Sequence, residues 1–199
     1  ARVANGPNNR VVTFQSQLHA LLTETGSQAN VLFCDAKGEK SVDFGLALDL
    51  LSDGMRIHFT PLNPTIAYRR FTLNDDNFVS LKRSGHLEAL VDLLADDGTG
   101  LKLYTTPNED AQQDISLSIN RFNVGELTHV IPFMPDVKGF LHGDLHYMQA
   151  DSTTTVSAEM LVERMTYNGV LLGNIGLNGA YFPNADQSHY VDGIVTKDG

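Results

Sequence analysis

Apolar and polar residues alternate along most of this chain, and this period of two restricts its fold more than any other feature. Between residues 42 and 50 every second position is apolar, and the positions between are mostly acidic or small. The same period returns at residues 55–59, 115–119, 141–147 and 156–162. Residues two apart on a strand lie on the same side of a sheet, so each segment predicts a strand with one apolar face. We therefore expect an all-β, mainly antiparallel fold.

Short turns separate the alternating segments. Ser52-Asp53-Gly54 and the stretch from Asp96 to Gly100 are typical of links between neighbouring strands. Asn168-Gly169 is the strongest turn signal, because both residues tolerate the positive φ of a type I′ hairpin turn. These turns predict successive antiparallel hairpins.

Helical signal is confined to residues 124–131. There Val124, Leu127 and Ile131 fall on one side, and Pro132 ends the segment. No linker or charge run divides residues 1–199, so we expect a single β-rich domain. Its repeated units of strand, turn and strand can be lengthened in either direction, as in solenoids.

The charge balance makes nucleic acid an improbable partner. The formal net charge is -10, and no cluster of Lys and Arg compensates for it locally. Electrostatic docking on an anionic membrane needs such a cluster too, so any lipid contact would be hydrophobic. No run approaches the roughly 18 apolar residues that span a bilayer. Cys34 is the only cysteine, so the chain forms no internal disulfide.

Few residues suggest chemistry. His142, Asp144 and His146 lie on one face of a predicted strand and are weak candidates for zinc ligands, because their spacing spreads them over about 13 Å. We expect a solvated polar face there, no metal and no cofactor. The Asp96–Gly100 stretch lacks the acidic spacing of a calcium loop, and Asp75-Asp76-Asn77 is predicted to be a turn.

Other motifs also have structural explanations. Gly173, Gly176 and Gly179 lack the flanking strand and helix of a dinucleotide site, so we expect bulges, close backbone approach or sheet curvature. No nucleophile elbow, phosphate-binding loop or zinc-protease motif occurs. We expect no enzymatic activity and no catalytic residues.

An apolar strand face must be covered, and alternation alone leaves two ways to cover it. Two sheets can pack their apolar faces together into a dry core. Alternatively, one open sheet can leave its face free for acyl chains, whose burial stabilises the complex by roughly 25 cal/mol per Å² of apolar surface.

Three segments resemble the TamB family of diderm bacteria, in its Bacteroidetes-type form, an AsmA-like group named for a translocation and assembly module. They are residues 61–81 (PLNPTIAYRRFTLNDDNFVSL), 131–145 (IPFMPDVKGFLHGDL) and 165–183 (MTYNGVLLGNIGLNGAYFP). The resemblance covers nearly all of the chain. It implies an elongated, curved sheet folded into a U-shaped hydrophobic groove, a β-taco, in a protein anchored in the inner membrane.

The chain begins with Ala1-Arg2-Val3 rather than Met and stops just past a predicted strand at residues 189–197, so we expect an interior piece of a longer protein. The resemblance implies that this piece is itself soluble and lies in the periplasm. There it would carry phospholipid between the inner and outer membranes and support the biogenesis of the cell envelope, with an outer-membrane β-barrel as partner.

We expect twelve apolar residues to line this groove and to contact lipid. They are Leu46, Leu48, Met55, Ile57, Ile115, Leu117, Leu141, Leu145, Val156, Met160, Ile175 and Leu177. Charged residues would face the water outside: Asp43, Asp49, Arg56, Glu159 and Glu163. The acidic surface would favour solubility.

Two other functions are compatible with the sequence. One is a chaperone-like scaffold that receives strands of outer-membrane β-barrels or autotransporters at its sheet edges by β-augmentation. The other is a closed structural or carbohydrate-binding β-sandwich. The absence of Trp makes sugar stacking less favourable, because Trp is a preferred rigid platform.

Overall fold

The chain forms one large antiparallel sheet and a separate pair of short strands. The computed structural model describes residues 2–4, 11–13, 15–35, 37–126, 135–150, 153–183 and 188–198. The strands are β1 (Arg2–Ala4), β2 (Val11–Thr13), β3 (Gln15–Leu22), β4 (Gly26–Cys34), β5 (Lys40–Leu51), β6 (Gly54–Ile66), β7 (Arg69–Arg70), β8 (Thr72–Leu73), β9 (Phe78–Lys82), β10 (Leu87–Leu94), β11 (Gly100–Thr105), β12 (Gln113–Asn123), β13 (Val137–Ala150), β14 (Thr153–Tyr167), β15 (Val170–Pro183) and β16 (His189–Asp198).

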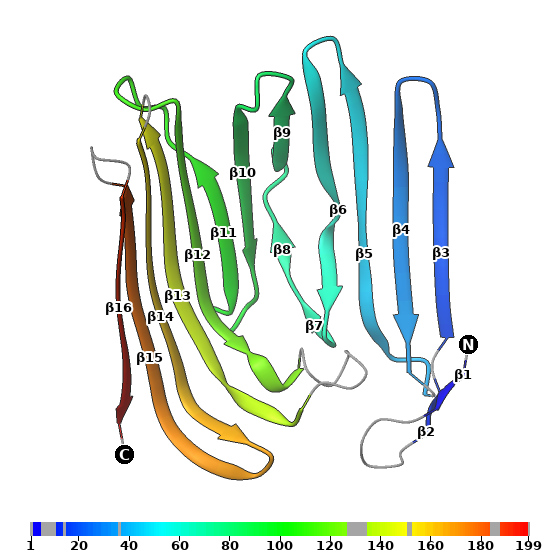
Figure 1. The fold of residues 1–199 in the computed structure, drawn as a ribbon. Helices are drawn as coiled ribbons and strands as arrows, with labels where there is room; N and C mark the ends of the chain where they lie inside the picture. Colours follow the sequence, from blue (N-terminus) through cyan, green and yellow to red (C-terminus); the bar gives the residue numbers. More distant parts are fainter. Residues whose placement is uncertain are drawn as a thin grey trace.

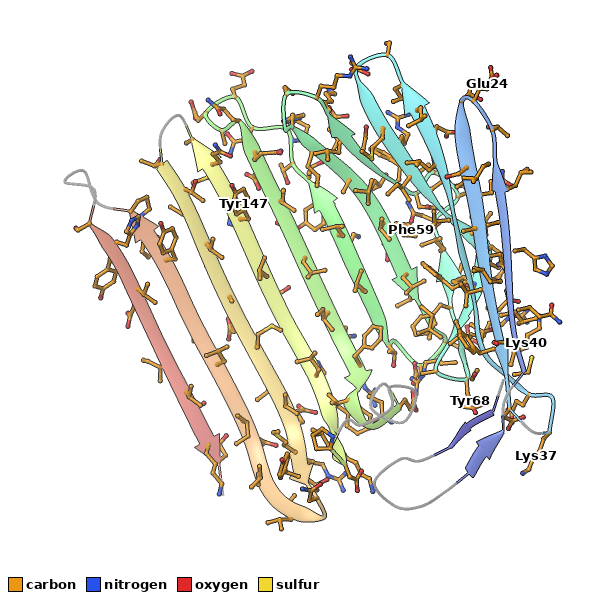
Figure 2. The ribbon with its side chains drawn as sticks, turned by 45° about the vertical axis from the view of Figure 1, so that its right-hand side comes forward. Glu24, Lys37, Lys40, Phe59, Tyr68 and Tyr147 are labelled. Carbon is orange, nitrogen blue, oxygen red and sulfur yellow. The ribbon has the colours of Figure 1, made fainter. Side chains whose placement is uncertain are left out.

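The large sheet is open and curved. Its 14 strands follow the order β16-β15-β14-β13-β12-β11-β10-β9-β6-β5-β4-β3, with β7 beside β6 and β8 beside β10. Sequence neighbours are therefore spatial neighbours nearly everywhere, as Figure 1 shows. In Figure 2 the strands β3–β5 stand at an angle to the plane of β11–β16. The predicted fold class, an elongated, curved, all-β antiparallel sheet, is confirmed, and the described strands do not form a closed sandwich.

The predicted turns join neighbouring strands. Asn168 and Gly169 have φ values of 47° and 80° and connect β14 to β15, as a type I′ hairpin turn requires. Ser52 and Asp53 connect β5 to β6, and the stretch from Asp96 to Gly98 connects β10 to β11. Of the predicted helix at residues 124–131, residues 124–126 are helical, whereas Leu127 and Ile131 lie outside the described part of the chain.

A line of irregular residues bends the strands β13 to β15 near one end. Gly139, Arg164 and Gly173 have positive φ, interrupt the pairing register and lie next to one another across the three strands. A Cβ on Gly139 would come within 2.9 Å of the Glu163 carbonyl oxygen, so glycine permits a close backbone approach there. Bulges of this kind increase bending and twist. The bulge expected among the glycines 173, 176 and 179 is therefore found at Gly173.

The strand between β6 and β10 is broken into two pieces, β8 and β9. At the break, the side chains of two asparagines make hydrogen bonds to the neighbouring strands in place of backbone hydrogen bonds. The Asn77 side chain accepts a bond from the Phe59 N–H at 2.7 Å and donates to the Phe59 carbonyl oxygen at 3.3 Å. On the other side, the Asn74 side chain accepts from the Asp92 N–H at 2.8 Å. The predicted turn at Asp75-Asp76-Asn77 is confirmed, and Asn77 itself is only 2% exposed.

The buried core is small and lies beside this break. Phe71, Leu73, Val91, Leu93 and Ala95 form its centre. Partly buried residues of β6, β9, β11 and β12 pack against it, including Phe59 and Phe122. Because side chains from β6 through β12 reach one cluster, the sheet is curved toward this side. No helix in the described residues is long and apolar enough to cross a membrane.

Candidate functional site

The pairing register aligns apolar side chains into rows that cross the sheet. Directly opposed residues of antiparallel strands lie on the same face. Leu145 of β13 is opposite Leu117 of β12, which is opposite Leu103 of β11, which in turn is opposite Val91 of β10. On the other side, Leu145 is opposite Ala158 of β14. One face of the sheet, which we call the apolar face, therefore carries a continuous apolar row.

All twelve residues predicted to line a groove belong to the apolar face. Leu48 pairs with Ile57, Ile57 with Val79, and Val79 with Ala89, which connects β5 to β10. From β12 onward the register connects Ile115 through Tyr147 to Val156. The remaining members follow from the same pairings: Leu46, Met55, Leu117, Leu141, Leu145, Met160, Ile175 and Leu177. Phe59 and Tyr147, which Figure 2 labels, lie on the same face.

The apolar face is partly exposed to solvent along its length. None of the twelve residues is buried, and Leu177 is 45% exposed. The large hydrophobic side chains that are buried in the described part of the chain, those of Phe71, Leu73, Val91 and Leu93, all belong to the cluster around Phe71. The described chain therefore leaves a broad apolar surface without a second sheet to cover it.

The apolar face also includes residues outside the predicted set. Leu18 and Leu22 of β3 and Val191 and Val195 of β16 extend it to both edges of the sheet. Their alternation is visible in the sequence, but each strand carries only two large apolar residues on this face. Two apolar residues form too short an alternating run to predict an apolar strand face from the sequence.

The opposite face is predominantly polar. The five charged residues predicted to face outward, Asp43, Asp49, Arg56, Glu159 and Glu163, all lie on it. A shallow hollow of about 330 Å³ opens on this face between β11 and β15. Polar side chains supply much of its lining, among them Tyr104, Ser118, Glu159 and Asn178. Two faces of opposite character therefore share one sheet.

The three weak zinc candidates bond to separate neighbours. His142 Nδ1 lies 3.1 Å from Asn120 Oδ1, and His146 Nε2 lies 2.8 Å from Asp114 Oδ1. Asp144 accepts a bond of 2.6 Å from the Ser118 hydroxyl. Within the described ranges, no group of three His, Cys, Asp or Glu side chains is placed to hold a metal ion. These residues instead form cross-strand polar pairs on the polar face.

The electrostatics of these pairs follow from their hydrogen bonds. The side-chain amide of Asn108, and then His146, hold the pKa of Asp114 below its ordinary value. In the Asp96–Gly100 turn, the backbone N–H and hydroxyl of Thr99 lower the pKa of Asp97 to about 2, with a further contribution from Arg69. Asp97 therefore orders its own turn and the Arg69 side chain.

Replacing Asp97 with asparagine is expected to remove a pH-dependent part of the stability. Because the folded-state pKa of Asp97 is depressed from 3.8 to about 2, its contribution is present above pH 3.8 and is lost as the pH falls toward 2. Urea unfolding of parent and variant across this range should show a gap in midpoint that closes on acidification. A gap that stays constant would contradict the ionic role of Asp97.

Comparisons with protein-family models, with curated proteins and with solved structures found no match to this chain.

Proposed function

We propose that this chain is a periplasmic groove segment of a TamB-like or AsmA-like protein, which carries phospholipid acyl chains between the inner and outer membranes. The observation that carries the proposal is the apolar face, which is continuous from β3 to β16 and largely uncovered. Contiguous apolar surfaces of this extent on soluble proteins mark sites for apolar ligands, membranes or partners. In this role the protein supports the biogenesis of the outer membrane.

The two faces suit an acyl chain that moves along the sheet. Aliphatic side chains such as Leu145, Met160 and Leu177 offer burial without directional bonds, so an acyl chain can shift from one row to the next at little cost. The acidic and hydroxyl-bearing side chains of the polar face, such as Glu159 and Ser157, remain in water. This chemistry favours a carrier of lipid tails over a site specific for one headgroup.

Replacing Leu145 with aspartate is expected to abolish lipid binding with the fold retained. Leu145 is half-buried in the middle of the apolar face, and a carboxylate there would lose its hydration on contact with an acyl chain. The measurement is native mass spectrometry of protein purified from a bacterial host, with organic extraction to identify phospholipid. Parent protein should carry phospholipid, and the variant should carry at least tenfold less.

A matched control places the same charge on the other face. Ser157 is exposed and directly precedes Ala158, which is opposite Leu145, but its side chain lies on the polar face. The Ser157→Asp variant should retain parental lipid content and parental circular dichroism. Lipid-free parent protein would refute the proposal, and so would a Leu145→Asp variant that unfolds, because unfolding indicates a dry core at this position.

The two open edges favour a second candidate function, a chaperone-like scaffold for β-barrel or autotransporter assembly. Among the described strands, β3 and β16 end the sheet and have a neighbour on one side only. Such edges can receive an extended client strand by β-augmentation. A crosslinking assay with a synthetic outer-membrane β-strand separates the candidates, because a client strand requires a free edge whereas phospholipid requires the apolar face.

A further inference from the structure

The two edge strands have few of the features that normally protect a sheet edge. All ten residues of β16 are exposed, and its large apolar side chains lie on both faces. On β3, Leu18 and Leu22 are 70% and 82% exposed. Neither strand contains proline, and neither pairs with its neighbour through a register shift. Protected edges usually carry proline, bulges or inward-facing charges. Lys197, opposite Ile175, is the one charged residue of β16 on the apolar face, at the C-terminal end of the strand, and the rest of both strands is suited to further pairing.

The strand order makes the two edges complementary to each other. The hydrogen-bonded path from β16 to β3 contains twelve strands, and all of its neighbours are antiparallel. An even number of alternating strands leaves the two edges running in opposite directions, as β3 and β16 do in Figure 1. A second copy shifted along the sheet therefore brings its β3 antiparallel to β16 with both apolar faces on the same side.

We propose that copies of this chain join head to tail, with β16 of one copy paired to β3 of the next. The apolar face selects the register, in which Leu18 is opposite Val195, Ala20 opposite Gly193, and Leu22 opposite Val191. The two leucines of β3 on the apolar face then meet valines of β16, and the small residues Ala20 and Gly193 meet each other. The existing row of Met160, Leu177 and Val195 continues into the row of Leu18, Val31 and Phe44 of the next copy.

The charges on the two strands are compatible with this register. Lys197 is placed opposite Ser16, and Asp192 is placed opposite Leu21, so no two like charges face each other. The interface is heterologous, because different surfaces meet, so each added copy leaves one free edge of each kind for a further copy. Assembly should therefore proceed beyond a dimer into linear oligomers that share one apolar face. This inference is independent of lipid binding.

Sedimentation velocity of the 199-residue chain over a range of concentrations tests the assembly. Parent protein should show species that grow beyond the dimer as concentration rises. Two variants each block one edge with lysine: Leu18→Lys with Leu22→Lys on β3, and Val191→Lys with Val195→Lys on β16. All four side chains are at least 70% exposed, so both variants should keep the parental circular dichroism.

Mixing the two variants gives the decisive result. Each variant alone should remain monomeric, whereas an equimolar mixture should form a heterodimer and nothing larger, because each copy has one competent edge. As a matched control, lysines at Val170 and Leu171 alter exposed residues at the β14–β15 hairpin and should leave assembly unchanged.

Three outcomes would overturn the inference. Parent protein that is monomeric at every concentration excludes self-assembly. A parent dimer that is lost only in the β16 variant indicates that β16 pairs with itself. A monomeric parent that crosslinks through β16 to an outer-membrane β-strand peptide assigns the edge to a client protein.

Discussion

Phe71→Ala is expected to lower the free energy of unfolding by about 3–5 kcal/mol, the cost typical of removing a buried aromatic side chain. Phe71 is 2% exposed at the centre of the small core, and its ring stacks on Phe122 with 6.0 Å between centroids. Its backbone N–H also donates to the Pro64 carbonyl oxygen at 2.9 Å. Because few other residues are buried, the sheet has little else to compensate for this loss.

Urea unfolding followed by circular dichroism measures the Phe71 effect. Phe182→Ala is the matched control, since Phe182 lies on β15 and is 44% exposed, and its loss should cost well under half as much. Equal destabilisation by the two variants would show that the cluster around Phe71 is not the main core of the sheet.

Asn77→Leu is expected to destabilise the fold by about 3 kcal/mol, although it keeps the volume of the side chain. The leucine leaves the N–H and carbonyl groups of Phe59 without their bonds to Asn77, and a buried polar group without a partner costs about 1–3 kcal/mol. The bond from the Asn77 amide to the Asn74 carbonyl oxygen, at 2.9 Å, is lost as well.

Thermal and urea unfolding should both show that Asn77→Leu is less stable than the parent protein. Asn178→Leu provides the control, because Asn178 is exposed on the polar face of β15, and this variant should change stability by less than about 0.5 kcal/mol. If Asn77→Leu were as stable as the parent, the break beside β6 would have to be held by packing alone.

Much of the architecture follows from local patterns in the sequence. The period of two assigns each side chain to a face, and tight turns such as Asn168-Gly169 fix the register of the next strand. For this reason the sequence alone predicts that residues as distant as Leu48 and Leu177 lie on one face, as the pairing register shows. Short hairpins leave sequential strands few other partners.

The centre of the sheet could not be predicted in the same way. Residues 61–77 contain two prolines and no clear alternation, and their structure depends on contacts with distant strands. Asn77 acts on Phe59, 18 residues earlier, and Phe71 packs on Phe122, 51 residues later in the numbering. Neither contact can be predicted from nearby residues. A buried asparagine looks like a turn asparagine in the sequence, and the partner of Phe71 lies far away along the chain.

The aligned bulges at Gly139, Arg164 and Gly173 fix where the sheet bends. The length of the strands and the number of strands can therefore change independently in evolution. Adding two residues to each strand of a hairpin, on the tip side of the bend, would deepen the sheet and keep every side chain on its face, whereas adding one residue would exchange the faces. Adding a whole hairpin at an edge would lengthen the sheet and leave the bend unchanged. Related chains should therefore differ in length by multiples of four residues per hairpin at tips such as Asn168-Gly169, and seldom at the bend itself.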